Sequence, residues 1–144
     1  MEIPDSVTSI GYNAFFYCTD LTNINVDNNN EIYKSIDGNL YNKAGTELIQ
    51  YAIGKETTSF TTPDSVTSIN KEAFEYCKNL TSVTFGGSVT SIGESAFLAC
   101  SNLSSITFKG TKAQWQAITK GNNWNFSISS DCKVYCSDET FDVR

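Results

Sequence analysis

The sequence has no histidine, only two prolines and one methionine, and a charged fraction of 18%. Without histidine, serine and cysteine triads lose their usual general base, and a zinc site loses one of its common ligands. No apolar run approaches the roughly 20 residues that a membrane-spanning helix needs. Glycine motifs that bind phosphates are absent as well. These absences argue against a triad hydrolase, a nucleotide-dependent enzyme, a zinc centre and membrane insertion.

The charge balance is acidic, with a formal net charge of −6 from 10 basic and 16 acidic side chains. Nucleic-acid binding through phosphates needs a basic face, and the lysines here are scattered along the chain. No carboxylate pair is singled out by its spacing, so we expect no enzyme, no cofactor and no metal site. The run Asp27–Glu31 offers oxygen ligands for calcium, but it lacks the EF-hand spacing and predicts a solvated turn.

What the chain does contain is an internal repeat of about two dozen residues. The segments IPDSVTSIGYNAFFYCTDLTNINV, TPDSVTSINKEAFEYCKNLTSVTF and GSVTSIGESAFLACSNLSSITF start at Ile3, Thr62 and Gly87 and align without gaps. Identical residue types recur at Val7/Val66/Val89, Ile10/Ile69/Ile92, Phe15/Phe74/Phe97, Cys18/Cys77/Cys100 and Leu21/Leu80/Leu103. A longer, degenerate repeat must lie between the first two copies. Its extra residues fall in Asn28–Tyr51, where Asn42–Gly45 separates two apolar segments and predicts a β-hairpin.

Each unit ends in the pattern Leu-x-x-Ile/Val-x-Val/Phe, whose last two apolar residues point to one face of a strand. The Val-x-x-Ile pair predicts a second short strand, and Ala-Phe-x-x-Cys between them spans about one helical turn. One such coil cannot bury its own apolar face, whereas stacked coils share a continuous core. We therefore predict a solenoid, mainly β with short helical turns.

These motifs resemble the BspA-like leucine-rich-repeat family over about Ile3–Lys109, with Asn70 in place of a glycine and Gly86-Gly87 in place of an Ile-Pro-Asp turn. The resemblance implies a right-handed leucine-rich-repeat superhelix from a bacterial-type cell-surface or secreted protein. We expect one domain over 1–144. Its expected parts are repeats at 3–26, 27–62 with the hairpin insertion, 63–85 and 86–108, a cap at 109–137, and a loose tail at 138–144.

The expected cap begins with a helix, because Thr111 followed three residues later by Gln114 is a capping-box signature. We predict this helix over Lys112–Thr119, with Gly121 as its C-terminal cap. Trp115, Ile118, Trp124 and Phe126 are available to cover the last coil, and Lys133–Cys136 predicts a closing strand. The two tryptophans offer an alternative as a sugar-stacking platform.

The five cysteines do not read as a disulfide framework. Cys18, Cys77 and Cys100 occupy one column of the repeat, where cysteine behaves as a small buried hydrophobic residue. Cys132 and Cys136 lie four apart on a predicted strand, roughly 13 Å from each other and beyond disulfide reach. We expect free thiols, and the spacing lacks the paired C-x-x-C knuckles of a zinc site.

The outward positions of the repeated strands predict a flat face rich in hydroxyl and amide groups, of the kind that solenoids use to bind partners. The candidate partner-binding residues form two columns, Asn23/Ser59/Ser82/Ser105 and Asn25/Thr61/Thr84/Thr107. The same residues also suit exposed strands that contact nothing. The inserted hairpin, with Tyr33, Tyr41 and Tyr51, is a second candidate that could equally pack on the solenoid.

The family resemblance implies a non-catalytic binding module that mediates adhesin-like contacts with a host or matrix protein. A structural spacer and a carbohydrate-binding module are the alternatives. Met1 leads directly into a repeat, so we expect a mature fragment of a longer protein without its signal peptide. An uncapped first coil, Ile3–Ile10, predicts a monomer or weak end-to-end association.

Overall fold

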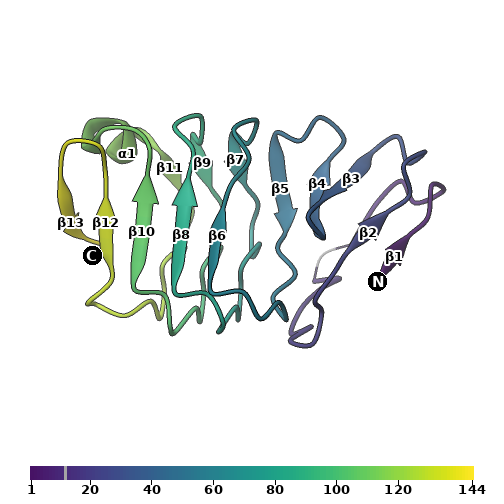
Figure 1. Ribbon diagram of the computed structural model, residues 1–144, viewed down its shortest axis with the longest axis horizontal. Helices are drawn as coiled ribbons and strands as arrows, with labels where there is room; N and C mark the ends of the chain where they lie inside the picture. The colour runs from purple at the N-terminus through teal and green to yellow at the C-terminus, as the bar shows by residue number, and fades with distance from the viewer. Residues whose placement is uncertain (12) are drawn as a thin grey trace.

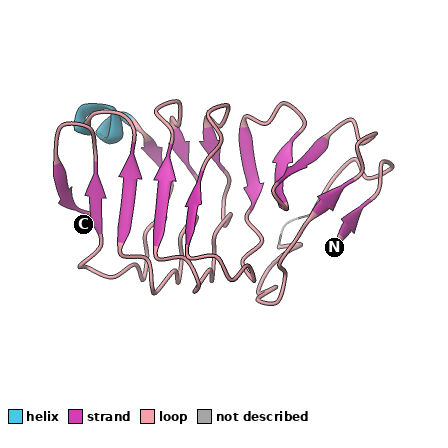
Figure 2. Cartoon of the chain, in the orientation of Figure 1, coloured by secondary structure: helices cyan, strands magenta, loops and turns pink. Residues whose placement is uncertain are grey.

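The computed structural model describes residues 1–11 and 13–144, which form a mainly-β solenoid (Figures 1 and 2). Short strands lie side by side along the long axis, and turns connect them at both ends of each coil. The strands are β1 (Glu2–Ile3), β2 (Asn25–Val26), β3 (Tyr33–Ile36), β4 (Asn39–Asn42), β5 (Glu47–Gln50), β6 (Ser59–Thr61), β7 (Ser68–Ile69), β8 (Ser82–Phe85), β9 (Ser91–Ile92), β10 (Ser105–Phe108), β11 (Thr119–Lys120), β12 (Lys133–Tyr135) and β13 (Thr140–Asp142), and the helix is α1 (Lys112–Ala117).

Two larger sheets run along the solenoid, one ordered β13-β12-β10-β8-β6 and the other β11-β9-β7-β5-β4-β3. Successive coils pair in parallel, and equivalent repeat positions face each other: Val83 pairs with Ile106 and Ile69 with Ile92. This register follows from the constant repeat length, because each strand meets its neighbour at the same point of the next coil. The predicted in-register stacking is therefore confirmed.

Apolar side chains fill the space between the two sheets. Strands β8 and β10 alternate between half-buried and buried residues, so that one face of each strand lies in the core. The Phe column shows how closely the coils pack: the rings of Phe74 and Phe97 are stacked, with centroids 4.6 Å apart and planes at 10°. Both side chains are fully buried.

The Ala-Phe-x-x-Cys segments do not form the helical turns that the sequence predicted. Each segment is a series of tight turns, as in the bonds from Glu75 N to Glu72 O and from Cys77 N to Phe74 O. The fourth residue of each segment has positive φ, and so does the residue just before its alanine. These left-handed pairs are Asn13/Tyr17, Glu72/Tyr76 and Ser95/Ala99, and a fourth pair with the same spacing, Asn123/Ser127, lies beyond the repeats. A regular helix cannot continue through such residues.

The degenerate repeat contains an antiparallel meander. Strand β3 pairs with β4 and β4 with β5, so there are two antiparallel pairs where the sequence suggested one hairpin. The Asp37-Gly38 turn has positive φ at both residues (51° and 77°), which matches a tight hairpin connection. Buried Asn39 anchors the meander, since its side-chain oxygen accepts a hydrogen bond from Ala52 N at 2.9 Å.

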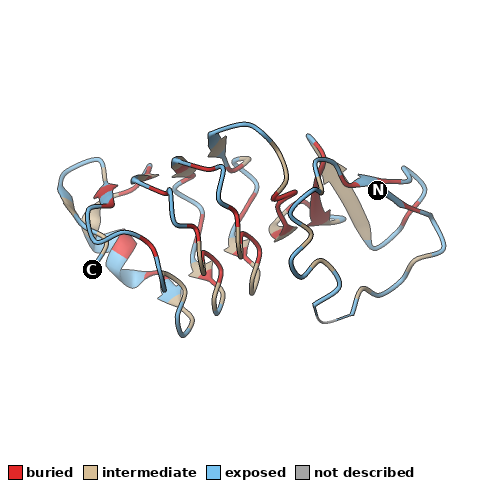
Figure 3. Ribbon diagram, turned by 90° about the horizontal axis from the view of Figure 1, so that it is seen from below, coloured by how far each residue is buried: buried red, intermediate tan, exposed pale blue. Residues whose placement is uncertain are grey.

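The first coil is set apart from the rest. Strands β1 and β2 pair only with each other in the sheet order, and Figure 1 shows them inclined to the other strands. They belong to a separate hydrophobic cluster with Ile24 and Leu40, in which Phe15 is only half-buried. Figure 3 shows this end of the molecule mostly exposed or half-buried, while buried segments continue through the later coils. The core is consequently divided within the degenerate repeat, where Leu40 belongs to the N-terminal cluster and Leu48 to the larger one.

The turn at Asp27–Glu31 is exposed to solvent at four of its five residues, as the sequence predicted. The exception is Asn30, which is fully buried. Its amide nitrogen donates hydrogen bonds of 2.9 Å to the carbonyl oxygens of Pro4 and Val7, and its side-chain oxygen accepts from Ile32 N and Tyr33 N. The residue fastens the first coil to the meander.

At the other end, Thr111 is the N-cap of α1: its side chain accepts from Gln114 N, while the Gln114 side chain accepts from Thr111 N. The helix ends earlier than predicted, with Ile118 and not Gly121 as its C-cap. Trp115 is buried against Phe108, with ring centroids 5.7 Å apart.

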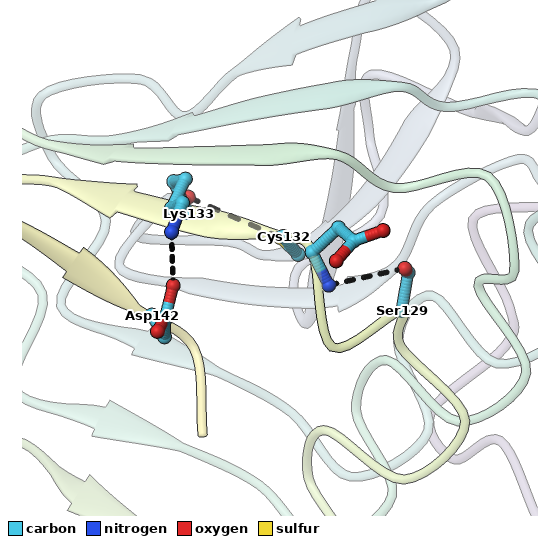
Figure 4. Close-up of polar contacts among 5 residues, drawn as sticks. Ser129, Cys132, Lys133 and Asp142 are labelled. Atoms are coloured by element: carbon cyan, nitrogen blue, oxygen red, sulfur yellow. Dashed lines mark hydrogen bonds and ion pairs between the residues drawn. The ribbon is translucent and has the colours of Figure 1, made fainter.

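Two other expectations for this end were wrong. Phe126 is 57% exposed and does not cover the last coil. The segment 138–144 is not a loose tail throughout, because β13 pairs antiparallel with β12. Figure 4 shows the ion pair between Lys133 and Asp142 that joins these two strands.

All five cysteines are free thiols. Burial raises the pKa of the Cys77 and Cys132 thiols to about 11, and it raises the pKa of Cys100 well above its ordinary value. A raised pKa leaves little of the reactive thiolate near neutral pH.

We therefore expect iodoacetamide to modify half-buried Cys18 well before Cys77, Cys100 and Cys132. Mass spectrometry of the labelled protein measures the rates. Equal labelling rates in the native protein would contradict this, and unfolding in urea should equalise them.

Candidate binding surface

Six of the eight predicted binding residues lie together on one sheet. Ser59, Ser82 and Ser105 are in register across β6, β8 and β10, and Thr61, Thr84 and Thr107 form a second row two residues further on. The residues between them, Val83 and Ile106, are buried, so the hydroxyl side chains occupy the outer face. We call these six residues the hydroxyl ladder.

The structure does not bring Asn23 and Asn25 into this ladder. Asn25 lies on β2, which pairs with β1 and not with β6. Its amide donates to Glu2 Oε1 at 2.8 Å, and Asn23 Nδ2 donates to Asn25 Oδ1 at 2.8 Å. The prediction of two continuous columns was wrong at this point, because the meander of β3, β4 and β5 follows β2 and the first coil is displaced.

The ladder continues beyond the predicted residues at its C-terminal side. Lys133 pairs with Ser105 and Tyr135 with Thr107, because β12 joins the same sheet in parallel. Tyr135 is 43% exposed, and the hydrogen bond that Lys133 donates to the Asp142 carboxylate raises the pKa of Lys133. Sequence reasoning had predicted this strand, but β12 lacks the repeat consensus that would have given its register.

The ladder is suited to recognition and not to bond-making chemistry. Its hydroxyl groups can both donate and accept hydrogen bonds, and no ionised side chain lies among the six. Within residues 1–11 and 13–144, no group of three or more cysteine, aspartate or glutamate side chains is arranged to hold a metal ion. The arrangement offers a flat, neutral surface with a charged and aromatic border at Lys133 and Tyr135.

The two other candidates from the sequence are largely packed inside. Tyr41 and Tyr51 are each 1% exposed, and Tyr33 is half-buried against the N-terminal cluster. Trp115 is 4% exposed and meets Trp124 edge-on at 5.9 Å. A sugar-stacking platform needs an exposed ring face, so the buried Trp115 cannot serve as one half of it.

Comparison with known proteins identifies leucine-rich repeat proteins as relatives. A family described as "BspA type Leucine rich repeat region" matches residues 1–57 and 50–135. A search of curated proteins found no match. In the described part of the chain, no helix has the length and apolar character required to cross a bilayer.

Three solved structures share the fold. A leucine-rich repeat protein from Eubacterium ventriosum is 28% identical, with a TM-score of 0.59, over 91% of this chain and 39% of its own. A leucine-rich cell surface protein from Faecalibacterium prausnitzii is 26% identical, with a TM-score of 0.63, over 83% of this chain and 50% of its own. The pneumococcal vaccine antigen PcpA is 19% identical, with a TM-score of 0.64. The match covers 96% of this chain and 50% of PcpA. The chain thus spans half or less of each.

Proposed function

Because the chain belongs to the BspA-type leucine-rich repeat family, we propose that it is a non-catalytic, adhesin-like module that binds a protein partner through the hydroxyl ladder. The supporting observation is the register of that ladder. Three parallel strands present the same two residue types at the same height, which produces a flat surface without ionic groups in its centre. Extended sheets of this kind are the usual binding surfaces of solenoids.

A location at the cell surface fits this role. The similar protein of Faecalibacterium prausnitzii is described as a cell surface protein. We propose the same location, or secretion, for the present chain. A host or matrix protein is then the natural class of partner, because such proteins are what an exposed bacterial surface meets.

Two substitutions that obstruct the surface of the hydroxyl ladder and preserve the fold test this proposed binding. We expect Thr84→Lys combined with Thr107→Glu to weaken binding to immobilised extracellular matrix at least about tenfold, the equivalent of 1.4 kcal/mol. The two residues face each other on neighbouring strands, so opposite charges maintain stability while their longer side chains obstruct the flat surface. Biolayer interferometry measures the change.

A matched control exists on the other sheet. Thr67 and Thr90 are exposed and precede β7 and β9 at equivalent positions. Thr67→Lys with Thr90→Glu adds the same charges there and should leave binding unchanged. Equal losses in both variants, or no binding by the unaltered chain, would refute the proposal.

A further inference from the structure

A groove opens between the first coil and the third. Its volume is about 480 Å³, and it runs between the turn that contains Phe15 and the turn that contains Glu72 and Glu75. Glu47 and Ile49 of the meander also line it. This volume lies in the range of pockets that hold small ligands, and the groove is separate from the hydroxyl ladder.

The groove exists because the degenerate repeat has a shortened turn. Tyr51 takes the place of the repeat phenylalanine: its backbone N–H donates to Ala73 O at 3.0 Å, as Phe74 N donates to Ala96 O at 2.8 Å. Leu48 of β5 pairs with Ile69 on the neighbouring strand β7 of the same sheet. Tyr51 follows Leu48 by three residues, whereas Phe74 follows Ile69 by five. The missing residues would have filled the space between the flanking turns.

Aromatic side chains form one side and the rim of this space. Phe16 and Tyr17 both line the groove and are 51% and 55% exposed. Tyr76 of the opposite turn touches them, with ring centroids 4.5 Å from Tyr17 and 5.9 Å from Phe16. Clustered exposed aromatic rings are characteristic of binding sites, because they bury large areas when a partner arrives.

The charge of the groove is mainly negative. Three glutamates, Glu47, Glu72 and Glu75, line it together with one lysine, Lys71. Lys71 Nζ lies 3.8 Å from Glu72 and 3.5 Å from Glu94 outside the groove, so it is shared between two carboxylates. Burial, and then the charge of Glu72, raise the pKa of Glu75, while Lys71 lowers it. A cation entering the groove would relieve this repulsion.

We propose that the groove binds an arginine side chain on an exposed segment of a partner protein. A planar guanidinium can stack on the rings of Phe16 and Tyr17 while its N–H groups donate to the Glu75 carboxylate. The net charge of −6 favours approach of such a segment. This site does not depend on the ladder, so either can exist without the other.

The probe is an acetylated and amidated peptide, Gly-Ser-Gly-Arg-Gly-Ser-Gly, titrated into the isotope-labelled full chain. We expect saturable shifts in the amide signals of residues 14–17, 47–50 and 71–76. The same peptide with citrulline, which has a similar shape without the charge, should bind at least tenfold more weakly, the size of effect expected for a lost charge-assisted contact.

Variants locate the site. Glu75→Gln should weaken arginine binding about tenfold. It should stay folded, because the raised pKa shows that ionisation of Glu75 disfavours the native state at neutral pH. Tyr17→Asn should weaken binding about threefold; asparagine tolerates the positive φ of 58° at this position.

Two controls separate this site from general attraction and from the ladder. Exposed Glu56 lies outside the residues that line the groove, so Glu56→Gln should change nothing. The Thr84→Lys/Thr107→Glu variant should retain arginine binding. Equal binding of the citrulline peptide, an equal loss in Glu56→Gln, or shifts confined to β8 and β10 would overturn the proposal.

Discussion

Replacing Phe97 by alanine is expected to lower the free energy of unfolding by about 3–5 kcal/mol. The Phe97 side chain is fully buried at the centre of the ring column. It stacks on Phe74 at 4.6 Å, meets Phe85 edge-on at 5.8 Å and approaches Trp124 at 6.4 Å. Alanine would remove all three ring contacts and leave a cavity that the two flanking coils can close only in part.

Urea denaturation followed by circular dichroism measures this change. A loss of this size is a large share of the roughly 5–15 kcal/mol that stabilises a typical domain. Phe126→Ala is the matched control, because it deletes the same ring from a side chain that is 57% exposed; its effect should stay within about 0.5 kcal/mol. Similar losses for the two variants would mean that the phenylalanine column is not the shared core.

The size of the expected effect follows from the architecture. Each coil contacts mainly its neighbours, so stability is approximately the sum of the coils and the interfaces between them. Phe97 contributes to the interface with Phe74 on one side and to the interface with Trp124 on the other. A residue of the first coil lacks that double role, since β1 and β2 pair only with each other and belong to a separate cluster.

The regular repeats were predictable because their spacing carries the register. Once Val66 and Val89 are aligned, Ile69 must meet Ile92 and Ser82 must meet Ser105, as the structure shows. The hydroxyl ladder over β6, β8 and β10 follows from the same alignment. The strand register does not determine whether the ladder binds a partner, so partner binding by the ladder stays a prediction.

The degenerate repeat was not predictable in the same way, because it has no second copy with which to align. That Tyr51 replaces the repeat phenylalanine depends on its hydrogen bond to Ala73, a contact with the following coil. The groove beside Glu75 results from that nonlocal pairing, and the displacement of Asn25 from the ladder results from the meander that follows β2. The pairing of β13 was hidden for a similar reason: its partner β12 lies outside the consensus.

One position of the repeat, occupied by Gly11, Asn70 and Gly93, relates the groove to the stacking of the turns. A Cβ on Gly93 would lie 2.4 Å from Lys71 N and 2.7 Å from the carbonyl carbon of Asn70, both backbone atoms of the preceding turn. Asn70 itself occupies the glycine position of its own coil, and it lines the groove where the shortened turn leaves room for a side chain. Asn70 can therefore replace the repeat glycine, because no backbone of the preceding turn lies against it.

Gly93→Ala is accordingly expected to cost about 3 kcal/mol of unfolding free energy, because the new methyl group can fit only if two stacked backbones separate. Gly11 is the equivalent residue of the first coil, and a Cβ there would meet nothing within 4 Å. Gly11→Ala should therefore leave stability unchanged or raise it by up to about 1 kcal/mol, through the reduced freedom of the unfolded chain. Urea denaturation of both variants decides the matter, and equal costs would show that close approach of the turns does not require glycine at this position.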